Sequence, residues 1–586
     1  MQDKTDVQIN NYTEVKNFFF YYVKNENNQS KKVIRQWWKH IFLISLILIL
    51  ILCLSKLNFS INTDGISLFL NNLKKIFEFS NTSDFYQNGI KADLWILSFK
   101  FLWKTFSITL AATVFGFIIS ILTSYVSCYQ LNKFYALPAK ALILLLRSFP
   151  ELVFIYIFAN SKLFQKDLAL FLVYVWFTWL WVHKYMIETL ENIDLRSYRK
   201  SVILGKGKIK SFVQEVIPRI TNRYFALLLY SFELNLRWTT VLSSLGLFGI
   251  GSLINFANDQ LLFEQLSIPL FVLLGLLVLL DLSFYLLNKY VLKVKSKQIK
   301  NTNYEQIIKQ NFNWKKILKL IILLSLIIFS IIQLSLLDFR ITKYPHLNNF
   351  WHSFWKPEWI NVNKAISSLF LNSIPFAILI CFFSFVFSLF ILPLTTDKLF
   401  SKPQVIFFKI TNSFFRLLPS IIIFFFIYPL FNSSFTLIII VLSISQTFKI
   451  DKQLNEIIND IDTKSIEILR LKGHTKLFIY FKYILPYVKK DYISLMLFNF
   501  EGQIRNSITY SFLSTELYIG NILTFKLSEK NFNLSQAMSF VWIVAIFIFS
   551  VNIFIEILKQ IYVTKNGFLF DMLIFFKSIK KAVRIR

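Results

Sequence analysis

Apolar stretches of about 20 residues alternate with polar stretches along the chain. An α-helix needs about that many apolar residues to cross the hydrocarbon core of a bilayer, so each stretch is a predicted membrane span. The pattern predicts an all-α polytopic membrane protein with about twelve spans, six in each half of the 586 residues. The predicted spans cover about 41–58, 101–127, 139–160, 167–185, 222–254, 266–292, 316–337, 366–395, 404–431, 434–449, 491–512 and 537–562.

A polar loop occurs twice between these spans, at residues 192–218 (the first repeated loop) and 460–486 (the second repeated loop). The shared positions are Asp194 and Asp462, Ser197 and Ser465, Gly205 and Gly473, Ile217 and Leu485, and Pro218 and Pro486. The two members of every pair are separated by one constant distance along the chain, here called the repeat offset. Glycine permits a tight turn, and proline suits the first turn of a helix that returns to the membrane. In a single such loop, Gly and Pro would be the ordinary residues of a connection. Two copies with the same spacing predict a docking surface for a soluble motor.

Charged residues within the predicted spans also occur in pairs, whose members are separated by the repeat offset or by one position more. Arg147 corresponds to Arg416, Glu233 to Glu501, and Arg237 to Arg505. Because the repeated features fall in the same order within two sets of six spans, the repeats are parallel. The chain is therefore expected to be a fused pseudo-dimer around a central path.

The charge distribution orients the predicted spans. The chain carries 64 Lys and Arg against 33 Asp and Glu, a net charge of +31, and the basic residues concentrate in loops beside the spans. This is the positive-inside pattern of a membrane protein, so nucleic-acid binding is not expected. It predicts cytoplasmic N- and C-termini in the plasma membrane, with both repeated loops in the cytoplasm.

The pattern divides the chain into five regions. We expect a cytoplasmic arm at 1–40, a first six-span repeat at 41–293, a basic cytoplasmic linker at 294–315, a second six-span repeat at 316–562 and a basic cytoplasmic tail at 563–586. The first apolar run begins too far into the chain for an ordinary signal peptide and lacks a small-residue cleavage site. It is therefore interpreted as an uncleaved first span, with Trp37 and Trp38 at the interface.

The repeated loops resemble the coupling motif of binding-protein-dependent ABC importer permeases. In that motif a Glu precedes a Gly by six positions, and a Pro follows an aliphatic residue thirteen positions after the Gly. The second loop has Glu467, Gly473, Leu485 and Pro486, whereas the first has Arg199 in place of the Glu, and neither has the Ala pair of the family.

Two further stretches are similar to the phosphonate-type permeases within that family. One is Arg147-Ser148-Phe149-Pro150-Glu151, and the other runs from Ser231 through Arg237 to the glycines Gly246, Gly249 and Gly251, which also predict a break after a helix in the long span 222–254. The resemblance covers about residues 95–290 and 360–560 and extends to the fused double permeases of mycoplasma high-affinity transport systems.

This resemblance implies a transport subunit that is not itself an enzyme. It implies a cytoplasmic ATPase, in two copies, at the repeated loops and an extracytoplasmic substrate-binding lipoprotein. The chain has no phosphate-binding loop of the Walker kind, so ATP and Mg²⁺ would be bound by the ATPase and no cofactor or metal by this chain. The implied substrate is a phosphonate or another phosphorylated small molecule, with thiamine or its phosphates as the alternative.

The intramembrane charges allow two interpretations. Glu233 and Arg237 are four positions apart on one helix face, as are Glu501 and Arg505. Each pair can therefore form an ion pair. Charged residues at such depth normally face a bundle interior or a wet cavity. They could line the path and favour an anionic solute, or lock neighbouring helices. For Arg147 and Arg416, near the cytoplasmic ends of their spans, we expect snorkelling to lipid phosphate, with a place in the path or in a structural ion pair as the alternative.

Other functions remain as alternatives. A gradient-driven secondary transporter would show inverted repeats and discontinuous helices rather than parallel repeats with large loops. A membrane-embedded enzyme would need polar catalytic residues gathered at one depth. In the outer loop 338–363 the tryptophans at 351, 355 and 359 are spaced for one face of a helix. An interfacial helix is expected there, with docking of a binding protein as the alternative.

Overall fold

The computed structural model describes most of both halves of the chain. The described residues are 20–24, 30–34, 36–86, 92–132, 134–155, 158, 164–191, 193–244, 247–287, 314–339, 344–360, 362–459, 461–514, 516–527 and 534–562. Most of the predicted N-terminal arm and linker, the predicted C-terminal tail, and Asn192, Gly246 and Asp460 lie outside them.

The chain divides into two compact units, residues 1–58 and 59–586. In the first unit, strands β1 (Phe20–Lys24) and β2 (Ser30–Ile34) form an antiparallel hairpin, and helix α1 (Gln36–Leu54) follows. The rings of Trp37 and Trp38 stack at the start of α1, 4.5 Å apart between centroids. This helix corresponds to the first predicted span.

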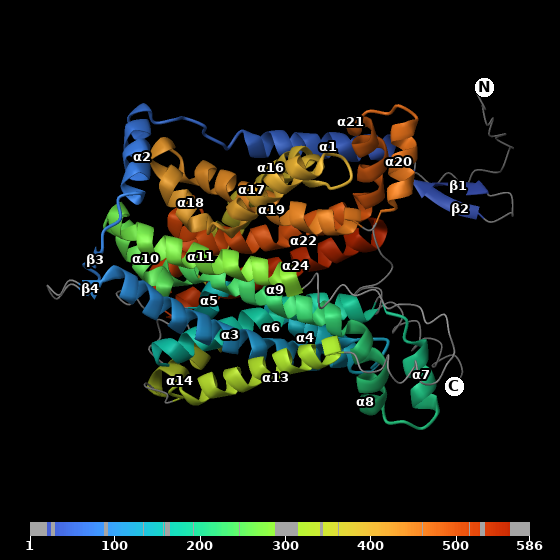
Figure 1. Ribbon diagram of the computed structural model, residues 1–586, viewed down its shortest axis with the longest axis horizontal. Helices are drawn as coiled ribbons and strands as arrows, with labels where there is room; N and C mark the ends of the chain where they lie inside the picture. Colours follow the sequence, from blue (N-terminus) through green and yellow to red (C-terminus); the bar gives the residue numbers. More distant parts are fainter. Residues whose placement is uncertain are drawn as a thin grey trace. The chain divides into compact units, whose positions relative to one another are not determined.

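The second unit is built almost entirely from helices (Figure 1). Its first half contains α2 (Thr63–Ile76), α3 (Leu94–Ser127), α4 (Ala136–Ser148), α5 (Glu151–Ile155), α6 (Lys166–Glu191), α7 (Arg196–Ile203), α8 (Lys208–Ser211), α9 (Ile217–Ser244), α10 (Ile250–Asp259) and α11 (Phe263–Leu287). Its second half contains α13 (Trp314–Ser335), α14 (Tyr344–Trp355), α15 (Val362–Ser368), α16 (Ile374–Thr395), α17 (Lys402–Leu417), α18 (Ser420–Ile427), α19 (Ser434–Asn459), α20 (Thr463–Leu471), α21 (Lys476–Ile479), α22 (Leu485–Thr509), α23 (Tyr518–Leu527) and α24 (Leu534–Tyr562). Strands β3 (Thr82–Ser83) and β4 (Ala92–Asp93) pair in the connection between α2 and α3.

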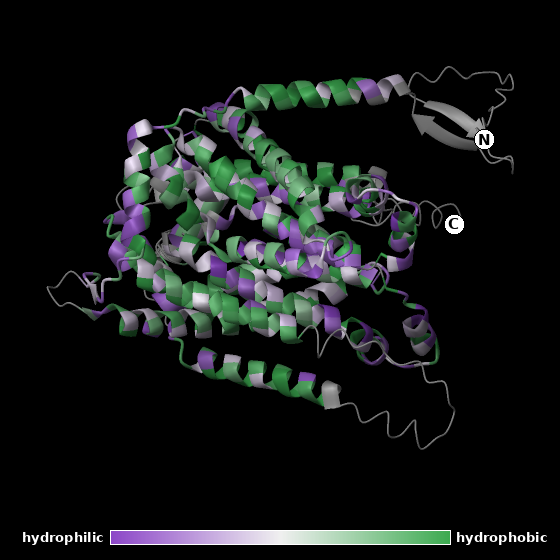
Figure 2. Cartoon of the chain, turned by 45° about the horizontal axis from the view of Figure 1, so that its top comes forward, coloured by the Kyte–Doolittle hydropathy of each residue, from purple (hydrophilic) through white to green (hydrophobic). Residues whose placement is uncertain are grey.

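The protein is an all-α polytopic membrane protein. Among the described residues, seven helical segments are long and apolar enough to cross a bilayer, and eight if a bent pair counts as one span. The seven are α3, α6, α11, α13, the continuous segment Val362–Thr395, α19 and α24. Figure 2 shows many hydrophobic residues along the long helices. Helices α9 and α22 are of similar length but more polar, because each carries a Glu–Arg pair (Glu233 with Arg237, Glu501 with Arg505) and further charged residues near its start.

Three predicted spans are broken in the structure. The span expected at 139–160 is divided into α4 and α5 at Phe149-Pro150, and the span expected at 404–431 bends by 86° between α17 and α18 at Leu418-Pro419. Proline supplies no N–H to continue the helical hydrogen bonds, which explains both breaks. The span expected at 222–254 is divided into α9 and α10, as the glycines predicted. A Cβ on Gly249 would lie 2.9 Å from the Thr105 hydroxyl oxygen, so the chain passes close to α3 there.

The segments around α2 and α14 connect the two halves. Ile61 forms an isolated antiparallel bridge with Phe431. Gly65, in α2, lies so close to Pro429 that a Cβ would meet its carbonyl oxygen at 1.8 Å, which excludes larger residues. The ring centroid of Phe354, in α14 of the second half, lies 5.8 Å from that of Phe149 in the first half.

The prediction for the outer tryptophans was partly wrong. Trp351 and Trp355 lie in α14, which packs against α24, but α14 ends at Trp355. Trp359 follows in a non-helical segment, so the three do not share one helical face. Pro357 lies two residues after the end of α14. A proline there cannot supply the next helical N–H.

Each half has an apolar core at the end that carries its repeated loop. Figure 1 shows α7 with α8, and α20 with α21, at the same end of the long helices. Counterpart positions, separated by the repeat offset, fill these two cores: Val182 and Ile450, Met186 and Leu454, Leu190 and Ile458, Tyr198 and Ile466, Phe212 and Tyr480, Val216 and Ile484, Ile220 and Val488, and Tyr224 and Tyr492. The loops are therefore packed onto the spans of their own half.

Candidate functional site: two repeated loops and two ionic clusters

Each repeated loop begins with an aspartate that fixes the start of a short helix. The Asp194 carboxylate accepts a hydrogen bond from the Arg196 backbone N–H at 3.0 Å, and Asp462 accepts one from the Lys464 N–H at 3.1 Å. These contacts satisfy an N–H that the first helical turn leaves unpaired. The Arg196 backbone and side chain hold the pKa of Asp194 below its usual value.

Both loops then make the same glycine turn. Gly205 has a φ of +85° and Gly473 a φ of +80°. In the first loop the Gly205 N–H donates to Val202 O and the Lys206 N–H to Ser201 O; in the second the Gly473 N–H donates to Arg470 O and the His474 N–H to Leu469 O. This is the Schellman arrangement that ends a helix on a left-handed residue. Both glycines thus form a turn, in the left-handed conformation that glycine adopts without strain.

The return into the membrane is also repeated. The π-helical turns η2 (Phe212–Val216) and η6 (Tyr480–Ile484) precede α9 and α22, in which Pro218 and Pro486 are the second residues. A π turn reaches one residue further back for its hydrogen bond: the Ile217 N–H donates to Phe212 O. This local widening accommodates the proline ring just after it within one continuous helical path.

Apolar side chains lie exposed at the tips of both loops. Leu204 is 80% exposed in the first and Leu471 is 87% exposed in the second. Ile203 and Ile209 are exposed beside Leu204, and Leu477 beside Leu471. Exposed apolar groups on an otherwise basic surface are typical of a protein interaction site. Arg199 and Glu467, which differ between the loops, are both exposed.

A first group of buried charges, here the Glu233 cluster, consists of Glu233, Arg237, Asp281, Arg416 and Lys452. Glu233 is 1% exposed and pairs with Arg416 at 2.8 Å and with Arg237 at 3.1 Å. Arg416 also binds Asp281 at 2.8 Å, and Lys452 approaches the same Asp281 oxygen at 3.3 Å. Arg237 donates to the backbone oxygen of Arg416 at 2.9 Å. The cluster therefore connects α9 and α11 of the first half with α17 and α19 of the second.

A second group, the Glu501 cluster, consists of Arg147, Lys184, Glu501 and Arg505. Glu501 is 3% exposed and pairs with Arg147, with Arg505 and, at 3.1 Å, with Lys184. This cluster connects α4 and α6 of the first half with α22 of the second. The buried Glu151 lies within electrostatic range of Arg147 and Arg505.

The two clusters are reciprocal across the two halves. Arg416 of the second half pairs with Glu233 of the first, and its counterpart Arg147 of the first half pairs with Glu501 of the second. The predicted pairs within α9 and α22 are present. The expectation that Arg147 and Arg416 reach lipid phosphate was wrong, because both guanidinium groups lie against glutamates of the opposite half. Pairing offsets the cost of about 2.5–3.5 kcal/mol that a lone charge carries in a bilayer.

Sequence reasoning missed three members of these clusters. Lys184 and Lys452 are separated by the repeat offset, so the offset that identified the other charged positions could have identified them. Asp281 has Phe549 at the matching place in the second half, so the repeat gives no sign of it.

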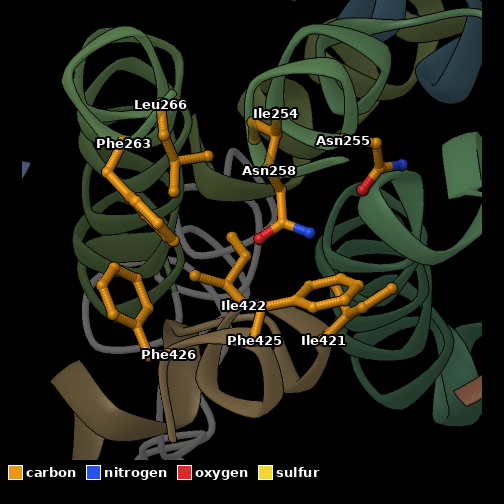
Figure 3. Close-up of a pocket in the computed structure, with 9 residues that line it drawn as sticks. All are labelled: Ile254, Asn255, Asn258, Phe263, Leu266, Ile421, Ile422, Phe425 and Phe426. Carbon is orange, nitrogen blue, oxygen red and sulfur yellow. The ribbon is translucent and has the colours of Figure 1, made fainter. Parts of the chain in front are cut away.

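Figure 1 shows α10 and α18 at the opposite end of the long helices from the repeated loops, and Figure 3 shows the largely apolar contact between the halves there. A pocket there has a volume of only about 10 Å³. That is no more than one water molecule needs. Its walls are Ile254, Asn255, Asn258, Phe263 and Leu266 from the first half and Ile421, Ile422, Phe425 and Phe426 from the second. The rings of Phe263 and Phe426 lie 6.2 Å apart. The halves are thus packed together at this end.

Parallel repeats, repeated loops and a reciprocal interface define a fused double permease. The family of binding-protein-dependent transport system inner membrane components matches the chain twice, at residues 112–296 and 365–566. The chain belongs to this family, whose members are permease components of ABC importers and not enzymes in themselves.

Curated relatives support the fused arrangement. The ABC transport system permease protein p69 of Mycoplasma genitalium is 29% identical over 81% of this chain and 86% of its own length. Its namesake in Mycoplasma pneumoniae is 27% identical over 80% and 85%. A putative phosphite transport system permease protein, HtxE, of Stutzerimonas stutzeri is 33% identical over 20% of this chain and 46% of its own length. No solved structure matches the chain.

Proposed function

We propose that this chain is the plasma-membrane permease of an ABC importer that moves a phosphorus oxyanion or a phosphorylated small molecule into the cell. A cytoplasmic ATPase subunit docks on each repeated loop, and an extracytoplasmic binding protein delivers the solute to the opposite end. Both termini are cytoplasmic. The substrate class is supported by the names of the phosphite permeases among the relatives and by the cations at the interface.

The repeated loops are the observation that carries this proposal. They present the same glycine turn and exposed apolar tip twice, which suits two copies of one soluble partner. A chain that uses an ion gradient would have no need of such a pair.

The helix that leaves each loop also leads to an ionic cluster. Glu233 occupies the same place in α9, counted from Ile217, as Glu501 occupies in α22, counted from Leu485. At the rise of an α-helix this place is about 24 Å along the helix axis. Because each loop is packed into the core of its own half, movement of a docked ATPase shifts the helix and the glutamate at its centre. The glutamates pair with arginines of the opposite half, so this shift alters the contact between the halves.

The test is ATP hydrolysis in proteoliposomes that contain this chain with the ATPase and binding-protein subunits of its transport system. Phosphite, a phosphonate and thiamine phosphate are added one at a time. We expect one of the phosphorus compounds to stimulate hydrolysis. The double variant Gly205→Val with Gly473→Val should lose that stimulation, because a β-branched residue does not tolerate a positive φ.

Gly207→Val is the matched control. Gly207 has a φ of −57°, and a Cβ added there would meet no atom within 4 Å. This variant should retain the stimulation. Hydrolysis that responds to neither ligand nor loop variant would refute the proposal and favour uptake driven by an ion gradient.

A further inference from the structure

A pocket of about 170 Å³ lies beside the Glu501 cluster, between α4, α6, α22 and α24. Its polar lining consists of Lys140, Arg147, His183, Lys184, Glu191, Glu501, Asn552 and Glu556. The volume is many times the roughly 10–15 Å³ that one water needs, enough for a small oxyanion with its remaining water. The pocket reaches Glu191, the last residue of α6, just before the first repeated loop.

The lining offers donors suited to an anion. Arg147 and Lys184 approach from two helices and converge on Glu501. A guanidinium and an ammonium group are the side chains that most often bind phosphate-type oxygens. The Asn552 side chain is only 6% exposed, and its amide nitrogen has no hydrogen-bond acceptor among the described residues. A buried donor without an acceptor costs free energy until a ligand supplies one.

Acidic groups restrict where in the pocket an anion can bind. Lys140 forms an ion pair with Glu191, and Arg505 with Glu501. Glu556 is the third acidic group of the lining. We therefore expect an anion to bind among Arg147, Lys184 and Asn552 rather than beside Lys140, whose charge Glu191 already neutralises.

The Glu233 cluster shows what such an anion would do. There the carboxylate of Asp281 binds Arg416 and Lys452, which are the counterparts of Arg147 and Lys184. In the second half the repeat offset places Phe549 at the position of Asp281, on α24, one turn before Asn552. The chain's own carboxylate thus occupies one cluster, whereas the corresponding side of the other cluster faces a pocket.

We propose that this pocket binds a phosphate-type oxyanion through Arg147, Lys184 and Asn552, in the role that Asp281 has in the Glu233 cluster. The bound anion competes with Glu501 for Arg147 and Lys184. Because Glu501 belongs to the second half and both cations to the first, binding weakens this contact between the halves. The anion is either the transported solute or the headgroup of an anionic lipid; only the first source rests on the proposed function.

The test is equilibrium binding of radiolabelled inorganic phosphate and phosphite to the purified full chain in nanodiscs of zwitterionic lipid. No ATPase is present, so the result is independent of whether ATP drives transport. Lys184→Gln should weaken binding about tenfold or more, the effect of losing one charge-assisted hydrogen bond. Lys452→Gln removes the same charge at the counterpart position and should change affinity less than about twofold. Asn552→Asp should abolish binding, because it places a carboxylate in the pocket.

The lipid arm repeats the measurement in nanodiscs that contain phosphatidylglycerol. If phosphate affinity falls there, the site takes a lipid headgroup; if it is unchanged, the site takes the solute. Size-exclusion profiles of each variant establish that it is folded. The proposal is overturned if the wild type shows no saturable binding in either lipid. Equal losses in Lys184→Gln and Lys452→Gln, or normal binding by Asn552→Asp, would overturn it as well.

Discussion

The Glu233 and Glu501 clusters use counterpart residues but are completed differently. In both, an arginine of one half reaches a glutamate of the other, and a lysine of the arginine's own half joins them: Lys184 accompanies Arg147, and Lys452 accompanies Arg416. The Glu233 cluster has a second carboxylate, Asp281, shared by Arg416 and Lys452. The Glu501 cluster instead borders a pocket. Both clusters thus keep the charged residues that join the two halves. They differ where the last span of each half, α11 or α24, approaches the cluster.

The largest effect should come from removing the central acids. Glu501→Gln leaves Arg147, Lys184 and Arg505 without the carboxylate that all three share. Breaking a buried pair in this way costs about 3–5 kcal/mol. Glu233→Gln should cost less, because Arg416 keeps Asp281. Thermal unfolding of the purified chain in detergent should therefore show a larger drop in melting temperature for Glu501→Gln.

The control for this pair is Glu467→Gln, which removes the same charge from an exposed position on the second repeated loop. It should leave the melting temperature nearly unchanged, since exposed charges contribute little. A larger loss in Glu233→Gln than in Glu501→Gln would contradict the comparison.

The sequence predicted these clusters only in part. The spacing of Glu233 and Arg237 places both on one face of a helix, so their pairing follows from helical geometry alone. That Arg416 crosses to Glu233 depends on how two distant helices pack, which periodicity does not specify. The same limit explains the wrong expectation for Arg147, whose position near a span end is equally compatible with lipid or with a buried partner.

The broken spans show a related limit. Hydropathy treats 404–431 as one run, because the residues on both sides of Pro419 are apolar. The 86° bend there depends on the proline and on the packing of α18 against α19. By contrast, the turns of the repeated loops could be predicted from the sequence. The positive φ at Gly205 and Gly473 is a local feature, and glycine is the residue type that adopts it most readily.

A smaller effect should separate the two glycines of the first repeated loop. Gly205 has a positive φ, whereas the φ of Gly207 is negative. Gly205→Ala should destabilise the end of α7 by about 1 kcal/mol or more, the cost of a left-handed conformation for a residue with a Cβ. Gly207→Ala should be neutral or slightly stabilising, because alanine adopts a negative φ readily and the unfolded chain loses freedom. Hydrogen exchange of the α7 amides measures both. Equal protection in the two variants would show that the turn does not depend on glycine.

The smallest expected effect concerns Asp194, the aspartate just before α7. The pKa of Asp194 is lowered by its hydrogen bonds with Arg196, so the ionised form stabilises the start of the helix. A lowered pKa means that this contribution is present at neutral pH and is lost as the pH falls through the folded-state pKa. Asp194→Asn keeps a side-chain oxygen that can accept the Arg196 N–H but cannot titrate. Below the pKa of Asp194, protection of the α7 amides should therefore fall in the wild type relative to Asp194→Asn. Parallel pH profiles in the two proteins would show instead that the charge of Asp194 does not contribute to this end of the loop.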